Sequence, residues 1–70
     1  MTEKVYYLED KTKFWEITVN DSSTRIRTGK KGFRGRSYPP KKHDSNKKAK
    51  QFALELVNSK IIEGYVLQAF

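Results

Sequence analysis

The chain has 70 residues, which is enough for one small domain but too few for two hydrophobic cores. It has no cysteine and one histidine, so disulfides, thiolate metal sites and multi-histidine metal sites are excluded. The formal net charge is +7, and no apolar stretch approaches the roughly 20 residues that cross a bilayer. Polar residues follow Met1 in place of an apolar leader, so we expect an intracellular protein, cytoplasmic or nucleoid-associated if bacterial and nuclear if eukaryotic.

The first twenty residues predict two strands joined by a polar turn. Residues 4–8 are aromatic and β-branched, which favours a short strand. Residues 13–20 alternate between two kinds of side chain, the pattern of a half-buried strand. We expect its inward face to hold Trp15, Ile17 and Val19, and its outward face to hold Phe14, Glu16 and Thr18. The central tryptophan is therefore predicted to be a core residue rather than a platform for a ligand.

The next segment predicts a hairpin, a glycine-rich loop and an edge strand. Residues 20–23 have turn chemistry, because Asn and Asp side chains hydrogen-bond their own backbone, and residues 24–28 alternate as the second strand of the hairpin. Residues 29–36 hold three glycines and are predicted to form a loop in which another backbone can approach closely. Residues 36–42 are expected to pair at an edge or as a broken strand, because Pro39-Pro40 donates no ladder hydrogen bond.

The last third of the chain predicts one α-helix at about residues 45–63. Asp44 or Ser45 is expected to cap its start, and Gly64 to end it in the left-handed conformation. One apolar stripe follows helical spacing and consists of Ala49, Phe52, Ala53, Leu56 and Val57. Residues 65–70 are largely apolar and are expected either to add a last strand or to pack over the core.

Together these elements predict an α+β fold. The sheet is antiparallel with about four strands, or five with the last segment, and the one α-helix packs across one face. Strands and helices do not alternate along the chain, which excludes a parallel nucleotide-binding sheet.

The positive charge is concentrated in one third of the chain. Residues 25–50 carry eleven Lys and Arg against one acid, Asp44, so this segment holds more than the whole net charge. Such a block indicates either a polyanion partner or a disordered basic arm. The disordered arm is disfavoured because Ile26, Phe33 and Tyr38 are interleaved with the charges.

Four features of the sequence occur in a familiar order. They are the strand Phe14-Trp15-Glu16-Ile17, the run Thr28-Gly29-Lys30-Lys31-Gly32-Phe33-Arg34-Gly35-Arg36-Ser37, the helix with Ala49 and Phe52, and the Lys60…Gly64-Tyr65 ending. This order resembles the WGR domain, a module of poly(ADP-ribose) polymerases and of bacterial proteins, over about residues 4–65. Thr28-Gly29-Lys30 stands at the Trp-Gly-Arg motif of that family, and Gly32 and Gly35 match the glycines that follow it.

The resemblance implies a single WGR-like domain over residues 1–70 that binds nucleic acid. In the polymerases, the motif tryptophan packs on the sugar at a DNA end and the motif arginine reaches a neighbouring domain. Thr28 has no ring to stack in this way. Lys30 keeps the charge of the motif arginine but lacks its planar, two-pronged geometry.

The candidate binding residues are the cations of the basic segment together with one aromatic ring. Arg25 and Arg27 are two apart on a strand, so we expect them to project from one face, next to the glycine loop. Phe33 either stacks on a base or folds back to close the core, and Tyr38 is a second stacking candidate. The predicted nucleic-acid-binding residues are Arg25, Arg27, Lys30, Lys31, Phe33, Arg34, Arg36, Lys41, Lys42, Lys47 and Lys48.

The start of the helix adds further cations. Lys47, Lys48 and Lys50 lie in its first two turns, where the macrodipole disfavours cations by about 0.3–1 kcal/mol each. These lysines either extend the phosphate-contacting surface or are solvated side chains that salt screens. His43 either leans on a phosphate or caps the entrance of the helix.

From these observations we predict a non-enzymatic module that grips the phosphate backbone of nucleic acid, with DNA favoured over RNA and little sequence preference. The sequence has no Ser/His/Asp set with adjacent roles, no cysteine and no Walker-type loop, so we expect no catalytic residues, no cofactor and no small-molecule substrate. We also expect no metal and no membrane partner. The alternative is a protein-interaction or interdomain module whose basic face docks an acidic partner.

Overall fold

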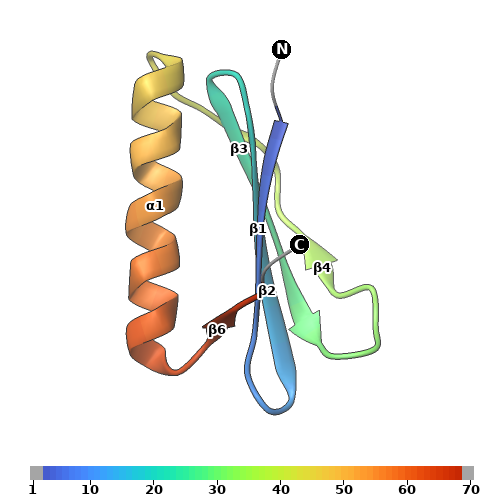
Figure 1. The fold of residues 1–70 in the computed structure, drawn as a ribbon. Helices are drawn as coiled ribbons and strands as arrows, with labels where there is room; N and C mark the ends of the chain where they lie inside the picture. The colour runs from blue at the N-terminus through green and yellow to red at the C-terminus, as the bar shows by residue number, and fades with distance from the viewer. Residues whose placement is uncertain (1–2, 69–70) are drawn as a thin grey trace.

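The structure is a computed structural model that describes residues 3–68. The strands are β1 (Glu3–Glu9), β2 (Lys13–Asn20), β3 (Ser23–Lys30), β4 (Arg36–Ser37), β5 (Lys41–Lys42) and β6 (Val66–Leu67), and the helix is α1 (Asn46–Glu63). Within the described residues the strands form one antiparallel sheet in the order β4-β3-β2-β1-β6, and β5 also pairs with β3. The α1 helix lies against one face of this sheet, and no helix among residues 3–68 covers the other face (Figure 1). The predicted α+β fold is confirmed.

The core lies between α1 and the inward face of the three long strands. Leu8, Ile17, Ala49 and Ala53 are fully buried there, and Trp15 is 5% exposed, as its place in the alternating strand predicts. The two alanines let the helix backbone come close to the sheet, because they carry no bulk beyond Cβ. Burying one large aliphatic side chain in such a core contributes about 1.5–3 kcal/mol to stability.

The ends of α1 follow from its capping residues. Ser45 is extended, at φ −156°, and its hydroxyl accepts a hydrogen bond from the backbone N–H of Lys48 at 3.2 Å. Gly64 is left-handed, at φ 114°, and its N–H donates to the Ile61 carbonyl at 3.0 Å. Of the two predicted caps at the helix start, Ser45 is therefore the one used, and the predicted end at Gly64 is confirmed.

The edge strand is broken where the prolines predict. The short strands β4 and β5 both pair with β3, and Tyr38-Pro39-Pro40 separates them. On the other edge, β6 pairs antiparallel with β1, so residues 66–67 add a strand rather than only packing over the core. The rest of the predicted C-terminal segment, residues 69–70, lies outside the described residues.

Two details differ from the sequence-based expectations. The predicted loop at residues 29–36 is shorter, because β3 continues through Gly29 and Lys30. Phe14, expected to face outward, is only 2% exposed. Its ring stacks on Tyr7 with ring centroids 5.7 Å apart, and the guanidinium of Arg27 lies 5.0 Å from its centroid. A small second apolar cluster on the outward face therefore buries Phe14.

Candidate nucleic-acid interface

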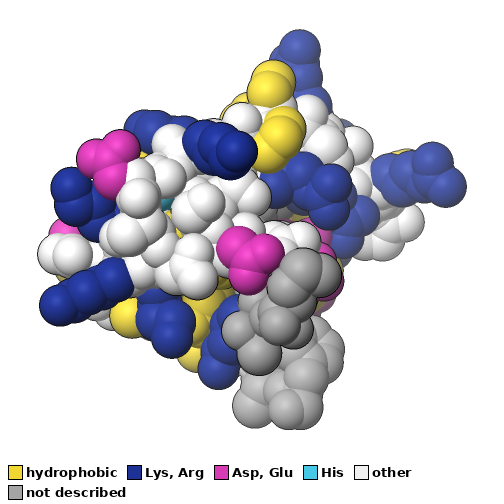
Figure 2. All heavy atoms as spheres, turned by 90° about the horizontal axis from the view of Figure 1, so that it is seen from above, with side chains coloured by type: hydrophobic (Ala, Val, Ile, Leu, Met, Phe, Trp, Pro, Cys, Tyr) yellow, Lys and Arg dark blue, Asp and Glu magenta, His cyan; other side chains and the backbone are white. Residues whose placement is uncertain are grey.

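The register of the sheet divides the predicted cations between its two sides. Residues directly opposite in an antiparallel pair point to the same face. Arg25 and Arg27 lie opposite Thr18 and Glu16 of β2, on the face away from the helix, so their predicted common face is confirmed. Arg36 lies opposite Thr28, and thus on the helix side. The strand cations Arg25, Arg27 and Arg36 therefore do not form one flat patch. Figure 2, which looks onto the end where α1 begins, shows Lys and Arg side chains in several separate places.

Arg27 is held by the protein itself. Its Nε donates to Oε1 of Glu16 at 3.2 Å, and its Nη1 donates to the backbone carbonyl of Arg34 at 3.0 Å. Because the same guanidinium also covers the Phe14 ring, Arg27 ties β2, β3 and the following loop together. Arg27 is therefore a structural residue, and a phosphate would have to compete with Glu16 for its guanidinium.

Two further predicted cations also have acidic partners. The Nζ atom of Lys31 lies 3.7 Å from Oε1 of Glu9, and the Nζ atom of Lys48 lies 3.3 Å from Oδ2 of Asp44. The basic segment has no acid between residues 21 and 44, but the sheet brings Glu9 and Glu16 from β1 and β2 beside its cations. The charge of the basic segment taken by itself does not predict that acids from distant strands partly neutralise its cations.

The segment 31–42 forms a continuous exposed basic surface, which we call the basic edge. Every residue in it is exposed, it contains no acid, and β4 and β5 hold it along β3. Its cations are Lys31, Arg34, Arg36, Lys41 and Lys42. Lys41 also lies over the ring of Phe52, with its Nζ 4.8 Å from the ring centroid, which connects the basic edge to α1.

The basic edge also presents two aromatic rings. Phe33 is 71% exposed and Tyr38 is 45% exposed. The interpretation in which Phe33 folds back to close the core is therefore wrong. A ring that is this exposed and flanked by cations has the properties of a stacking platform for an unpaired base.

The residues at the Trp-Gly-Arg motif positions differ in exposure. Thr28 is half-buried, and its hydroxyl donates to the Phe14 carbonyl at 2.8 Å. Lys30 is exposed at the end of β3. Only the second of these two side chains is thus available to a ligand.

The residues at the helix start play separate roles. Lys47 and Lys48 are exposed, and Lys48 is the one held by Asp44. His43 places its Nε2 2.9 Å from the Thr24 hydroxyl and packs its ring on Phe52, with centroids 4.8 Å apart. His43 therefore joins the segment before α1 to β3, whereas Ser45 caps the helix.

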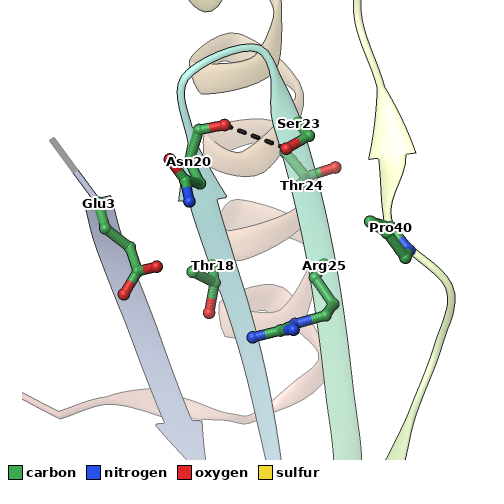
Figure 3. A pocket seen from close by; sticks show the side chains of 7 residues that line it. All are labelled: Glu3, Thr18, Asn20, Ser23, Thr24, Arg25 and Pro40. Carbon is green, nitrogen blue, oxygen red and sulfur yellow. Dashed lines mark hydrogen bonds between the residues drawn. The ribbon is translucent and has the colours of Figure 1, made fainter. Parts of the chain in front are cut away.

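Sequence reasoning missed a hollow of about 220 Å³ on the face away from the helix. Its walls come from β1, β2, β3 and the segment between β4 and β5, and Arg25 is the one predicted binding residue among them (Figure 3). The other lining residues are Glu3, Thr18, Asn20, Ser23, Thr24 and Pro40. Only the strand register brings them together. In the sequence, the hollow was indicated only by the polar residues at outward positions of β2, Thr18 and Asn20.

Two other kinds of functional feature are absent from the described residues. Residues 3–68 contain no group of three or more His, Cys, Asp or Glu side chains close enough to hold a metal ion. The single described helix lacks the apolar length needed to cross a bilayer.

Comparison with known proteins gives one informative similarity. No protein-family model matches the chain, and no curated protein matches it. The fold is similar to part of a crystal structure of a protein from Bacteroides fragilis, with 30% sequence identity and a TM-score of 0.78. The similarity covers 97% of this chain and 20% of the other, so this chain spans about one fifth of that protein's length.

Proposed function

We propose that this chain is a non-enzymatic nucleic-acid-binding module of the WGR type, with DNA favoured over RNA, and that the basic edge is its contact surface. The observation that carries the proposal is that residues 31–42 are exposed throughout and hold five cations and no acid. A polymer of phosphates is the partner that such a surface attracts most strongly, because each neutralised phosphate releases a counterion.

The two aromatic rings refine the proposed ligand. Phe33 and Tyr38 are exposed within the basic edge, and base stacking on such rings requires bases that are free of a duplex. We therefore favour single-stranded segments, with Arg34 and Arg36 on the phosphates and Phe33 under a base. The resemblance to the WGR domain supports nucleic-acid binding, whereas the half-buried Thr28 does not support its DNA-end contact.

The test is a salt titration with a short single-stranded oligonucleotide. If the five cations of the basic edge each neutralise one phosphate, log K should fall with log salt at a slope of about −3.5 on single-stranded DNA. Fluorescence anisotropy with a labelled thymine oligonucleotide measures this slope. An affinity that is unchanged between low and moderate salt would contradict the proposal.

A matched pair of variants locates the surface. Arg34→Gln/Arg36→Gln removes two charges from the basic edge, and Lys4→Gln/Lys50→Gln removes two charges beside a different hollow, between β1 and the start of α1. The first variant should lower the affinity, and it should make the salt dependence shallower by the share of two phosphate contacts. The second variant should change neither the affinity nor the salt dependence substantially. Equal losses would mean that the charge acts without a defined site.

The second candidate function is docking of an acidic protein segment or neighbouring domain. The observation that favours it is that the similar Bacteroides fragilis structure contains this fold within a chain about five times as long. Competition separates the two functions. A nucleic-acid module loses its labelled oligonucleotide to heparin or unlabelled DNA, whereas a docking module gives no anisotropy change with DNA at any concentration.

A further inference from the structure

The hollow on the face away from the helix has a cation and an anion on opposite walls. The Arg25 guanidinium extends from β3 toward Thr18 of β2, and the Glu3 side chain approaches from β1 (Figure 3). Within residues 3–68, no hydrogen bond or ion pair occupies the head group of either side chain. The two charges thus face one polar space without neutralising each other.

The spacing of the strands keeps the two charges apart. β1 and β3 are separated by β2, so their backbones lie about 10 Å from each other. Between them, Thr18 and Asn20 provide a neutral, hydrogen-bonding floor, and Ser23 is held over the turn by its bond to the Asn20 carbonyl at 3.1 Å. A ligand must therefore span the hollow to interact with both Arg25 and Glu3.

This arrangement selects a class of ligand. A bare phosphate suits Arg25 but is repelled by the Glu3 carboxylate across the hollow. A planar group with acceptors on one edge and donors on the other suits both walls. Among the nucleobases, guanine has this arrangement, since O6 and N7 accept hydrogen bonds on one edge while N1–H and the N2 amine donate on the other.

We propose that this hollow binds an unpaired guanine, with Arg25 donating to O6 and N7 and Glu3 accepting from N1–H and the N2 amine. The proposal rests on the proposed nucleic-acid binding and adds a base preference to it. Pro40 lines the hollow and immediately precedes Lys41-Lys42 of the basic edge. A nucleic-acid strand bound by these two lysines therefore passes beside the hollow. The guanine must be unpaired, because a duplex already uses its N1–H and N2 donors.

The experiment compares three nine-base oligonucleotides by fluorescence anisotropy: thymine alone, thymine with one central guanine, and the same with central inosine, which lacks the N2 amine. The single guanine should tighten binding about ten-fold over thymine alone, and inosine should lose much of that gain. Binding of the thymine oligonucleotide tests the proposed function, and the gain from guanine tests the guanine site. Equal affinity for all three would overturn the guanine site and leave the proposed function standing. Absence of binding to all three would overturn both.

Two single variants assign the contacts. Arg25→Gln should abolish the gain from guanine, and Glu3→Ala, which leaves no side-chain acceptor, should remove the difference between guanine and inosine. The control is Lys42→Gln, which removes a charge from the basic edge, and should weaken all three oligonucleotides alike while keeping their ratios. Retention of the guanine preference in Arg25→Gln would overturn the proposal, and circular dichroism of each variant establishes that it is folded.

Discussion

Gly29 and Gly35 pack backbone against backbone: a Cβ atom on Gly29 would lie 2.6 Å from the Cα atom of Gly35. Six positions apart in sequence, they bring the end of β3 against the segment that enters β4. Gly35 is also left-handed, at φ 72°, and a Cβ there would meet the Thr28 carbonyl oxygen at 2.5 Å and the Phe14 ring at 2.6 Å. These two glycines therefore position the loop that carries the basic edge.

Gly35→Ala should destabilise the fold by about 2–4 kcal/mol, because strain from the left-handed conformation adds to overpacking against Phe14 and Thr28. Gly32→Ala is the control, since Gly32 is also left-handed, at φ 86°, but has nothing within 4 Å of its added Cβ. That variant should cost only about 1 kcal/mol. Urea unfolding measures both, and equal losses would contradict the close packing.

Arg27 and Arg25 should differ in their effects on stability, although they project from the same face. Arg27→Gln loses the Glu16 ion pair, the bond to the Arg34 carbonyl and the contact with Phe14, so we expect a loss of about 1–2 kcal/mol. Arg25→Gln, which breaks no bond to a described residue, should stay within about 0.5 kcal/mol of the parent protein. Similar free energies of unfolding for the two variants would show that Arg27 is not a structural residue.

Phe33→Ala should weaken single-stranded DNA binding while leaving stability unchanged. The ring is 71% exposed and contributes little to packing, so the free energy of unfolding should change by less than about 0.5 kcal/mol. Loss of one stacked base costs about 1–3 kcal/mol of binding free energy, which is roughly 5- to 150-fold in affinity. Phe33→Trp should keep the affinity. Full binding by the alanine variant would exclude stacking at this position.

Ser45→Ala should destabilise the protein by about 1 kcal/mol, because the backbone N–H of Lys48 loses its hydrogen-bond acceptor at the start of α1. Ser45→Asp restores an acceptor and adds a negative charge near the positive end of the helix macrodipole, so it should match or exceed the parent protein. Thermal unfolding followed by circular dichroism compares the three proteins. A stable alanine variant would mean that another group caps the helix.

Part of the stability of the fold should be lost at acidic pH because of Asp10. Its Oδ1 atom accepts hydrogen bonds from the backbone N–H groups of Thr12 at 2.8 Å and Lys13 at 2.6 Å, and these bonds lower the pKa of Asp10 from 3.8. The ionised form is therefore favoured by folding, and its contribution is complete above pH 3.8 and lost as the pH falls through the lower folded pKa.

Asp10→Asn keeps a hydrogen-bond acceptor without the charge, and it should be less stable than the parent protein at neutral pH. The difference in urea midpoint between the two proteins should hold down to about pH 3.8 and narrow as the pH is lowered below that value. A difference that stays constant with pH would show that the charge of Asp10 makes no contribution to the stability of the β1–β2 turn.

The elements themselves were predictable because their determinants are local. The alternation in residues 13–20 predicted β2 at its observed bounds, and the capping candidates, Asp44 or Ser45 at the start and Gly64 at the end, predicted where α1 begins and ends. The burial of Phe14 was not predictable in this way. It depends on Tyr7 from one neighbouring strand, Arg27 from another, and the glycine backbone that passes over it.

The candidate site was predictable only in part, for the same reason. Sequence alone located the excess of cations in residues 25–50, because charge is a property of each residue. Which cations remain exposed and unpaired is a property of the register. Strand pairing placed Glu16 beside Arg27 and Glu9 near Lys31, left residues 31–42 exposed, and set Arg25 across a hollow from Glu3. Local patterns thus determined the helix, the long strands and the charge of this protein. Only the tertiary structure decided which charges face each other, because that depends on contacts between residues far apart in the chain.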